Sequence, residues 1–396
     1  MDEIKQLVEA QREKLVALRR DFHRHPELAF QEQRTANIVE AQLRTAGLDE
    51  IRSGVGGYGV WGVLKGGKPG RTVLVRADID GLPIEEQNEV DYRSENKGVM
   101  HACGHDGHTA IALTLAAILA ERREEIPGIV KFAFQPAEEL GAGAKPMLAA
   151  GILHEPEVDT VIGLHLWNNL QAGKLGICNG PIFAGADTVE ITVKGKGGHG
   201  AQPHQTVDSL VVGAEIVVAL QTLVSRECQP GETAIVTVGS FHAGSASNII
   251  SEEAKLALSV RSVKPETRQY LLRRIEEIAQ GIAGAMRAKC EFSVRPGVPP
   301  VINDPTVADV LRRAALATLG ADNVLDNFST TVSDDMGYFL EAKPGCYFLM
   351  GSGNASGGQA FPHHHPRFDL DESCLAPAVE IMIRAIFELN QLEKIN

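Results

Sequence analysis

The sequence predicts an α/β protein in which a mixed, mostly parallel sheet with flanking helices carries an inserted domain. Up to about residue 180, short β-rich runs alternate with helical patterns, which is typical of βα units around a buried sheet. Between residues 187 and 263 the strands alternate polar and apolar side chains, as in a half-exposed antiparallel sheet. After residue 296 the first pattern returns. The middle segment is therefore expected to interrupt one discontinuous domain.

The first and last parts of the chain supply the elements of this larger domain. Residues 4–18 place apolar side chains at helix spacing among charges, which predicts an opening helix. Strand-like runs follow at 72–75, 129–134, 161–165 and 345–350, and further helices are expected at 109–121, 305–319 and 374–392. At 396 residues the chain exceeds what one hydrophobic core usually spans, which favours two domains.

The middle segment predicts a smaller domain with the element order βαββαβ. Its expected strands and helices are, in chain order, 187–194, 207–227, 233–241, 254–263, 265–287 and 290–295. This order is that of a ferredoxin-like sandwich, in which two helices cover one face of a four-stranded antiparallel sheet. We therefore expect a discontinuous domain of residues 1–184 and 297–396, with an inserted domain of residues 185–296.

Composition and charge exclude several classes of partner. The formal charge is −13, from 38 basic and 51 acidic side chains, and no basic block is present to bind nucleic acid or anionic membrane. The N-terminus lacks the apolar core of a signal peptide, and no run of 18 apolar residues could span a bilayer. The six cysteines show no CxxC pairing, which is typical of reduced thiols in a cytoplasmic protein.

Acidic, histidine and cysteine side chains gather after the strand-like runs, where ligands bind in open α/β sheets. The clusters are His101–His108 (HACGHDGH), Glu138-Glu139, His165, His363–His365 and Asp78-Ile-Asp80. In an extended segment Cys103 and His105 would face one centre, because residues two apart point the same way. A thiolate and an imidazole are good ligands for zinc-like ions. Each residue alone is more often an ordinary core or surface group, but their joint occurrence favours a metal site.

Together the clusters predict a two-metal hydrolytic site. Two ions a few ångströms apart can polarise a carbonyl and ionise a bridging water. Cys103 is the expected bridge, because its sulfur has lone pairs for two metals. The other available ligands are His105, Glu139, His165 and one of the three histidines 363–365. Glu138 is the expected general base, and Asp78 and Asp80 are expected to orient ligand histidines.

Motifs spread over the whole chain resemble those of a known enzyme family. They are Asp21–Leu28 (DFHRHPEL), Arg76–Pro83 (RADIDGLP), His101–His108, Gln135–Glu139 (QPAEE), Gly163–His165, Gly197–His204 (GGHGAQPH) and His364–Glu372 (HHPRFDLDE). With them the sequence resembles the di-metal amidohydrolases and metallopeptidases that include hippurate hydrolase, bacterial aminoacylases (N-acyl-L-amino acid amidohydrolases), auxin-conjugate hydrolases and related carboxypeptidases. The Cys-Gly-His form of the metal motif is specific to the hippurate-hydrolase-like branch.

The resemblance implies a fold of the di-zinc peptidase type and a role for each matching residue. It implies two divalent ions per subunit (Zn, Mn, Co or Ni) held by Cys103, His105, Glu139, His165 and His364. His364 is chosen because the family histidine stands two residues before a proline, although His363 and His365 remain open. It also implies that Glu138 is the base, with Asp80 counted among the catalytic residues.

For residues 185–296 the resemblance implies a lid that also dimerises through its sheet, giving a homodimer or homotetramer. His199 matches a lid histidine that stabilises the oxyanion, often in the neighbouring subunit's site. Asn248 and Arg261 match lid positions that bind the substrate carboxylate. One departure is Ser333-Asp-Asp-Met336, where relatives often carry Glu-Asp, and it affects the expected shape of the pocket wall.

The expected reaction is metal-dependent hydrolysis of the amide bond of N-acyl-L-amino acids, or of the C-terminal bond of short peptides. Water bridging the metals would attack the carbonyl, and Glu138 would take its proton and pass it to the leaving amine. Two alternatives remain. Cys103 could be a nucleophile paired with His105 or His101, or the protein could bind metal without catalysis.

Overall fold

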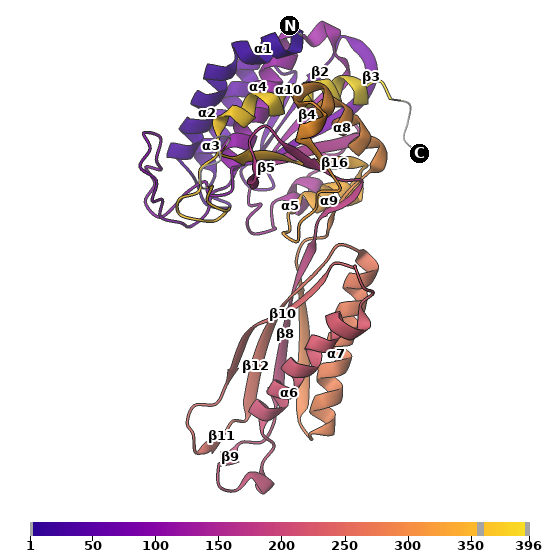
Figure 1. Cartoon of the computed structure of the whole chain (residues 1–396). Helices are drawn as coiled ribbons and strands as arrows, with labels where there is room; N and C mark the ends of the chain where they lie inside the picture. The colour runs from indigo at the N-terminus through magenta and orange to yellow at the C-terminus, as the bar shows by residue number, and fades with distance from the viewer. Residues whose placement is uncertain (1–2, 355–359, 393–396) are drawn as a thin grey trace. The chain divides into compact units, whose positions relative to one another are not determined.

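The chain forms two compact units in the computed structural model, which describes residues 3–354 and 360–392 (Figure 1). The first unit comprises Met1–Ile182, Ile302–Ser329 and Asp334–Asn396, and the second comprises Phe183–Val301 and Thr330–Ser333. The predicted boundaries at 184/185 and 296/297 lie close to these divisions. The brief return of residues 330–333 to the second unit had no signal in the sequence.

The first unit is built on an eight-stranded sheet with the order β1-β2-β4-β3-β5-β16-β6-β15. The strands are β1 Glu50–Val55, β2 Gly59–Lys65, β3 Lys68–Asp78, β4 Pro127–Gln135, β5 Thr160–Gln171, β6 Leu175–Ile177, β15 Val324–Asp326 and β16 Gly345–Gly353. The four central strands β4, β3, β5 and β16 run parallel, whereas β1, β2 and β6 add antiparallel pairs. The predicted mixed, mostly parallel sheet is therefore confirmed.

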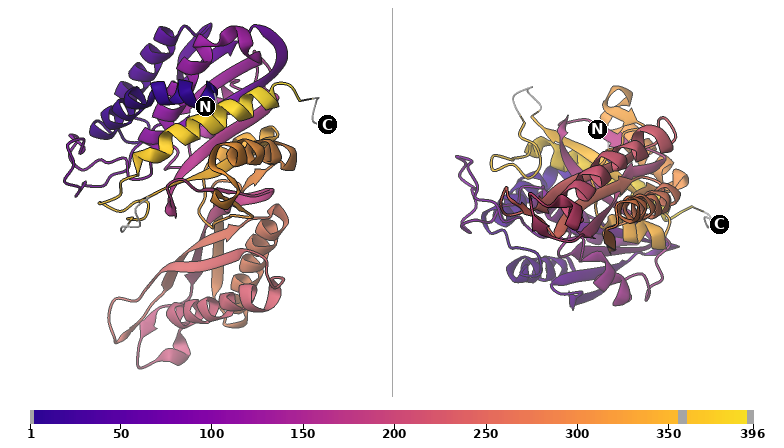
Figure 2. Two further views of the ribbon diagram at one scale, coloured as in Figure 1. Left: turned by 45° about the horizontal axis from the view of Figure 1, so that its top comes forward. Right: turned by 90° about the horizontal axis from the view of Figure 1, so that it is seen from below.

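Helices pack on this sheet, and its central strands are buried on both faces. The helices are α1 Glu3–Ala10, α2 Arg12–Arg24, α3 Gln33–Ala46, α4 His105–Glu121, α5 Ala144–Ala149, α8 Pro305–Leu319, α9 Met336–Ala342 and α10 Leu375–Leu389. Alternate strand residues such as Val73, Val75 and Phe348 share one core with α4, α8 and α10. Helix α10 lies beside α1, α4 and α8 (Figure 2). Tyr347 points to the other face, where its hydroxyl donates to Asp334, next to α9.

The second unit has the element order βαββαβ. Its main elements are β8 Gly185–Lys194, α6 Ser209–Thr222, β10 Ala234–Ala243, β12 Glu253–Ser262, α7 Pro265–Ala285 and β13 Lys289–Pro296. The sheet order is β10-β12-β8-β13 with every pair antiparallel, and α6 and α7 lie on one face (Figure 1). A short ribbon of β9 Gly198–His199 and β11 Ile249–Ile250 extends it. The strands β7 Gly180–Phe183 and β14 Val301–Asn303 pair where the chain passes between the units.

Helix α6 is shorter than the predicted 207–227 and has two apolar sides. It ends at Thr222 and continues as a π turn, Leu223–Glu227. Its inner side joins the core through Val212, Ile216 and Leu220. The segment Ser209–Glu227 is long and apolar enough to cross a membrane by length and composition, and 33% of that window is buried inside the protein. The outer side of α6 exposes the apolar side chains of Leu210, Val211 and Val218, and the π turn exposes Val224.

Candidate metal centre

The register of the parallel strands brings three predicted clusters to one edge of the first unit's sheet. Asp78, which ends β3, pairs with Gln135, which ends β4. Arg76 pairs with Gly163 of β5, so His165 stands level with Asp78. The prediction that His165 closes its strand is wrong, because β5 continues to Gln171 alongside β16. The histidine nevertheless lies at the expected height, where β3 and β4 end.

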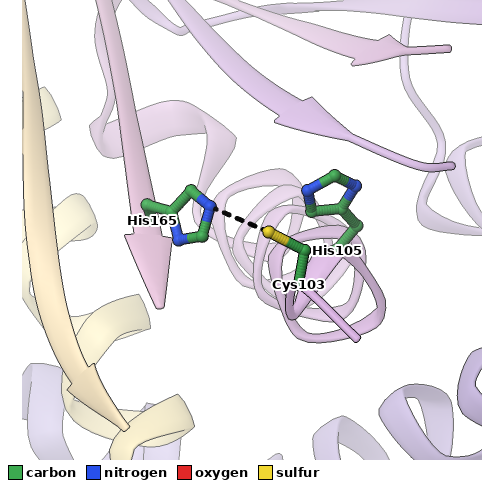
Figure 3. A group of neighbouring side chains, drawn as sticks. All are labelled: Cys103, His105 and His165. Carbon is green, nitrogen blue, oxygen red and sulfur yellow. Dashed lines mark hydrogen bonds between the residues drawn. The ribbon is translucent and has the colours of Figure 1, made fainter. Parts of the chain in front are cut away.

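The segment that carries Cys103 and His105 is not extended, and that prediction is also wrong. Gly104 adopts a left-handed backbone with φ +89°, and α4 begins directly at His105, four residues before the predicted start. The left-handed turn is a conformation that glycine adopts readily. Cys103 thus projects from a bend and His105 from the first turn of a helix. Their ligand atoms still lie within 4.8 Å of each other and of His165 (Figure 3).

Main-chain carbonyls set the tautomers of the two buried histidines. His105 Nδ1 lies 2.9 Å from the carbonyl oxygen of Asp80, and His165 Nδ1 lies 2.7 Å from that of Leu166. A carbonyl oxygen can only accept, so each Nδ1 carries a proton, and in the neutral ring each Nε2 presents a lone pair. His165 Nε2 faces Cys103 Sγ at 3.5 Å (Figure 3). His105 Nε2 is buried and has no hydrogen-bond partner among residues 3–354 and 360–392.

The two adjacent glutamates point to different neighbours. Glu139 groups with Cys103 and His364, and its Oε2 lies 3.4 Å from His364 Nε2. Its Oε1 is buried without a hydrogen-bond partner in the described part of the chain. Glu138 instead groups with Asp334 and Asp335. Both glutamates approach His105 Nε2 to 3.8 Å, so the pair spans the space in front of this histidine.

The three consecutive histidines occupy different environments. His363 Nε2 donates to the carbonyl of Leu166 at 2.9 Å, and its ring stacks on Trp167. His365 accepts the amide of Arg367 at its Nδ1. His364 is 52% exposed, adopts φ +66°, and directs its Nε2 toward Glu139. Of the three, His364 is therefore the one whose free nitrogen reaches the cluster.

The centre holds an excess of buried negative charge. Burial raises the pKa of Glu138 well above its usual range, and Asp334 and Glu139 raise it further. Burial also raises the pKa of Glu139, but His364 and His105 outweigh this effect and the net pKa is lowered. Burial and Glu139 raise the pKa of the Cys103 thiol. Divalent cations would relieve this repulsion and deprotonate the thiol.

The donor set fits such ions. A thiol, two imidazole nitrogens and a carboxylate converge within a few ångströms, which is the mixed sulfur, nitrogen and oxygen chemistry that zinc-like ions bind. Two of these donor atoms, His105 Nε2 and Glu139 Oε1, are buried without hydrogen bonds in the described residues. Such buried polar atoms call for a partner.

Known proteins resemble this chain over most of its length. The profile of peptidase family M20/M25/M40 matches residues 74–388. The chain belongs to this family. It is 45% identical over 303 residues to an N-acyl-L-amino acid amidohydrolase from Geobacillus stearothermophilus, covering 76% of this chain and 81% of the relative. It is 36% identical to thermostable carboxypeptidase 2 from Saccharolobus solfataricus, with 91% of each chain covered.

A solved relative extends the likeness to the fold. The dinuclear metal binding peptidase of the M20 family from Bacillus subtilis is 34% identical, with a TM-score of 0.85 over 97% of this chain and 99% of that chain. The resemblance inferred from the motifs is thus confirmed, and the chain is a hydrolase of the M20 type, a metal-dependent amidohydrolase.

The two aspartates at and just beyond the end of β3, Asp78 and Asp80, bind different groups in this M20 hydrolase. The backbone carbonyl of Asp80 accepts a hydrogen bond from Nδ1 of His105. Its side-chain Oδ2 accepts a second one from the amide of Glu139, at 3.0 Å. Asp78 instead accepts Nδ1 of His108 at 2.6 Å, and His108 Nε2 in turn accepts the amide of Leu166. Both ring nitrogens of His108 are therefore engaged in hydrogen bonds within the protein. Asp80 therefore contacts the predicted ligand His105, whereas Asp78 bonds to His108 and only approaches His105 Nε2, at 3.9 Å.

A buried ionic network behind the centre was missed by sequence reasoning. The Arg76 guanidinium donates to Asp78 at 2.7 Å and to Asp335 at 2.8 Å, and it approaches Asp334 at 3.3 Å. Asp335 also accepts the side-chain amide of Gln135 and the backbone amides of residues 143 and 144. The sequence had suggested only a departure in the pocket wall at residues 333–336. The sequence signal that could have revealed this network is the presence of charged residues, such as Arg76, at the ends of apolar runs.

The second unit of the M20 hydrolase separates its three predicted site residues into two places. His199 pairs with Ile249 in the β9–β11 ribbon, and the Gly200 amide donates to the carbonyl of Asn248. Nδ1 of His199 accepts the amide of Ala201 at 3.0 Å, which leaves the ring proton on Nε2. Arg261 lies near the other end of β12, where it donates to the carbonyl of Thr331 at 3.0 Å. Eight residues of strand, about 26 Å, separate Arg261 from the ribbon end of β12.

Proposed function

We propose that the protein hydrolyses the amide bond of N-acyl-L-amino acids, or releases C-terminal residues from short peptides, using two divalent ions per subunit. The observation that carries the proposal is the buried convergence of Cys103, His105 and His165, with Glu139 and His364 beside them. The names of the amidohydrolase and carboxypeptidase relatives support the two substrate classes. Zinc, manganese, cobalt and nickel all suit this mixed donor set.

When bound, the two ions would polarise the amide carbonyl and lower the pKa of a water molecule. Glu138 accepts the proton of the attacking water and then delivers it to the leaving nitrogen. Its surroundings suit this task, because burial and the charges of Asp334 and Glu139 favour the protonated form that must exist between the two transfers. Asp80 keeps His105 and the Glu139 backbone in place while the proton moves.

Residues of the second unit complete the proposed chemistry. His199 carries its proton on Nε2 and donates it as a hydrogen bond to the developing oxyanion. Arg261 pairs with the substrate carboxylate, because a guanidinium binds both carboxylate oxygens. Asn248, which lies in the His199 ribbon, contacts the same carboxylate from the other subunit. Since Arg261 and the His199 ribbon stand at opposite ends of β12, one subunit supplies them to different active sites. A homodimer or homotetramer is thus part of the proposal.

The outer side of α6 is the surface through which we expect subunits to associate. The helix-free face of the sheet is polar, with Glu190, Thr192 and Lys194 in β8. Helix α6, in contrast, exposes Leu210, Val211 and Val218, and the π turn that follows it exposes Val224, with Phe241 of edge strand β10 also exposed. Apolar side chains gathered in this way mark an association surface. We therefore propose α6 and the β10 edge as the interface, in place of the open sheet face.

Substitution of Val218 by glutamate is expected to convert the oligomer to a monomer. Val218 is 66% exposed, so the folded subunit tolerates the charge, but an apolar interface does not. Sedimentation velocity measures the mass of the variant, and Thr192→Glu on the polar sheet face serves as the matched control. An oligomer that persists in Val218→Glu and dissociates in Thr192→Glu would place the interface on the sheet.

Removal of metal tests the proposed function itself. Chelated enzyme is expected to release no amino acid from N-acetyl, N-benzoyl or dipeptide substrates, and Mn²⁺, Zn²⁺ or Co²⁺ is expected to restore release. The variant Cys103→Asp is expected to keep part of this activity, because a carboxylate can also bridge two ions. Activity that survives chelation but is lost in Cys103→Asp would instead establish a cysteine nucleophile. Metal binding without turnover of any substrate would indicate a non-catalytic protein.

The cytoplasm is the proposed location. All six cysteines of the chain are free thiols, and Cys103 must stay reduced to bind metal. Reducing compartments preserve such thiols.

A further inference from the structure

Two glutamates in the segment before α3 have different targets. Glu27 caps the helix, because its carboxylate accepts the amides of Arg34 and Thr35 at 2.9 and 2.8 Å. Glu32 stands at the N-cap position itself, yet its side chain makes no cap hydrogen bond. It reaches across to the loop that follows β4. This arrangement is unusual, because a carboxylate at the N-cap position normally accepts hydrogen bonds from the first backbone amides of its own helix.

Glu32 holds two amides from residues of unusual backbone conformation. Its Oε1 accepts the amide of Phe30 at 2.9 Å and the amide of Ala137 at 2.9 Å. Phe30 has φ +60° and Ala137 has φ +53°. Non-glycine residues in this region are strained and persist only where the surroundings enforce them. The Glu32 side chain is fully buried, and its Oε2 has no hydrogen-bond partner in residues 3–354 and 360–392.

The hydrogen bond to the Ala137 amide affects the site, because Ala137 directly precedes Glu138 and Glu139 in the chain. On the other side of Glu138, Asp80 Oδ2 accepts the amide of Glu139 at 3.0 Å. Two buried carboxylates thus hold the amides of the residues that flank Glu138, one before it and one after it. The main chain of Glu138 is fixed from both sides. Its side chain can therefore turn toward Asp334 while that of Glu139 turns toward His364.

We propose that Glu32 is a positioning residue that enforces the strained turn at Ala137 and thereby separates the two glutamates into base and metal ligand. The catalytic part of this inference rests on the proposed function, whereas its metal-binding part does not. The hydrogen bonds need an acceptor oxygen and not a charge. Burial raises the pKa of Glu32 to about 7, with Asp80 adding to the effect, which agrees with a side chain that works as an acceptor.

The experiment compares Glu32→Ala, Glu32→Gln and Glu27→Ala as full-length proteins. Glutamine keeps an oxygen that accepts both amides, whereas alanine removes it. We expect Glu32→Ala to lose roughly 10- to 100-fold in kcat with KM changed little, and a similar factor in affinity for Zn²⁺ measured by calorimetric titration of the apoprotein. We expect Glu32→Gln to stay within about threefold of wild type in both quantities, because the hydrogen bonds remain.

Glu27→Ala is the matched control, since it weakens the same segment and the cap of α3 without touching residue 137. It is expected to lower the melting temperature by destabilising the helix start and to leave kcat and Zn²⁺ affinity unchanged. Equal losses in Glu32→Ala and Glu27→Ala would show a structural role only and overturn the proposal. A Glu32→Gln variant as weak as Glu32→Ala would overturn it as well. If wild type cleaves no substrate, the proposed function fails, but the Zn²⁺ titrations still decide the role of Glu32.

Discussion

Glu138→Gln is expected to lower kcat by roughly 10²- to 10⁴-fold while metal content stays at the wild-type value. Glutamine has nearly the same shape but cannot accept the proton of the attacking water. Glu138 faces Asp334 and Asp335, not the Cys103 and His364 side of the cluster, so its loss leaves the proposed ligands in place. Steady-state kinetics and metal analysis of the same preparation measure the two quantities.

Two further variants serve as controls for Glu138→Gln, one at a proposed metal ligand and one at the surface. Glu139→Gln should lose metal as well as activity, because its carboxylate lies in the donor set. Glu95→Gln, on an exposed glutamate, should change neither quantity. A Glu138→Gln enzyme that keeps most of its activity with metal bound would show that Glu138 is not the base.

Arg76→Met is expected to lower the free energy of unfolding by about 3–5 kcal/mol, because it leaves buried carboxylates without their counter-charge. Arg76 is almost fully buried and is the cation shared by Asp78, Asp334 and Asp335. Methionine fills similar space, so the loss comes mainly from charge and hydrogen bonds. Urea unfolding of the metal-free protein measures the difference, and Arg295→Met, on an exposed arginine, should change stability by less than about 0.5 kcal/mol.

The deficit of Arg76→Met should shrink as the pH falls. In wild type, burial raises the pKa of Asp335 to about 7 even though Arg76 lowers it. Without Arg76, the pKa of Asp335 in the folded state rises further above the unfolded value of about 3.9. A raised carboxyl pKa contributes stability below the unfolded value, and this contribution is lost as the pH rises through the folded value. The difference from wild type should therefore be larger at pH 8 than at pH 5, and a deficit independent of pH would indicate packing loss instead.

The sequence could predict which residues converge but not how each one is presented. Asp78, Gln135 and His165 stand level because neighbouring parallel strands place residues at matching heights, and hydrophobic runs reveal such strands. No comparable rule predicts the backbone conformation of the HACGHDGH segment. Its glycine allows a left-handed turn that starts α4 at His105, and this choice depends on packing against the sheet. Likewise, the end of β5 depends on its pairing with β16.

The contacts of the residues behind the site, such as Arg76 and Glu32, could not be predicted from the sequence for a different reason. Arg76 and Asp335 are 259 positions apart, and Glu32 and Ala137 are 105 apart. Such pairs have no local spacing that identifies them. The βαββαβ order of the second unit, in contrast, follows from alternation within single strands. The separation of Arg261 from His199 follows only once β12 and the β9–β11 ribbon are placed together.

The two buried histidines of the cluster take their orientation from peptide carbonyls, those of Asp80 and Leu166. In many metal sites a side-chain carboxylate performs this task and can be lost by mutation. A peptide carbonyl is present whatever amino acid occupies the position. Genetic drift at position 166 can therefore alter size and packing without deleting the acceptor that sets the tautomer of His165. Position 80 differs, because Asp80 Oδ1 also lies 3.3 Å from His105 Nδ1 and its Oδ2 accepts the amide of Glu139. The orientation of the His165 ring is thus buffered against single substitutions at the position that supplies its acceptor, whereas that of His105 also depends on a side chain.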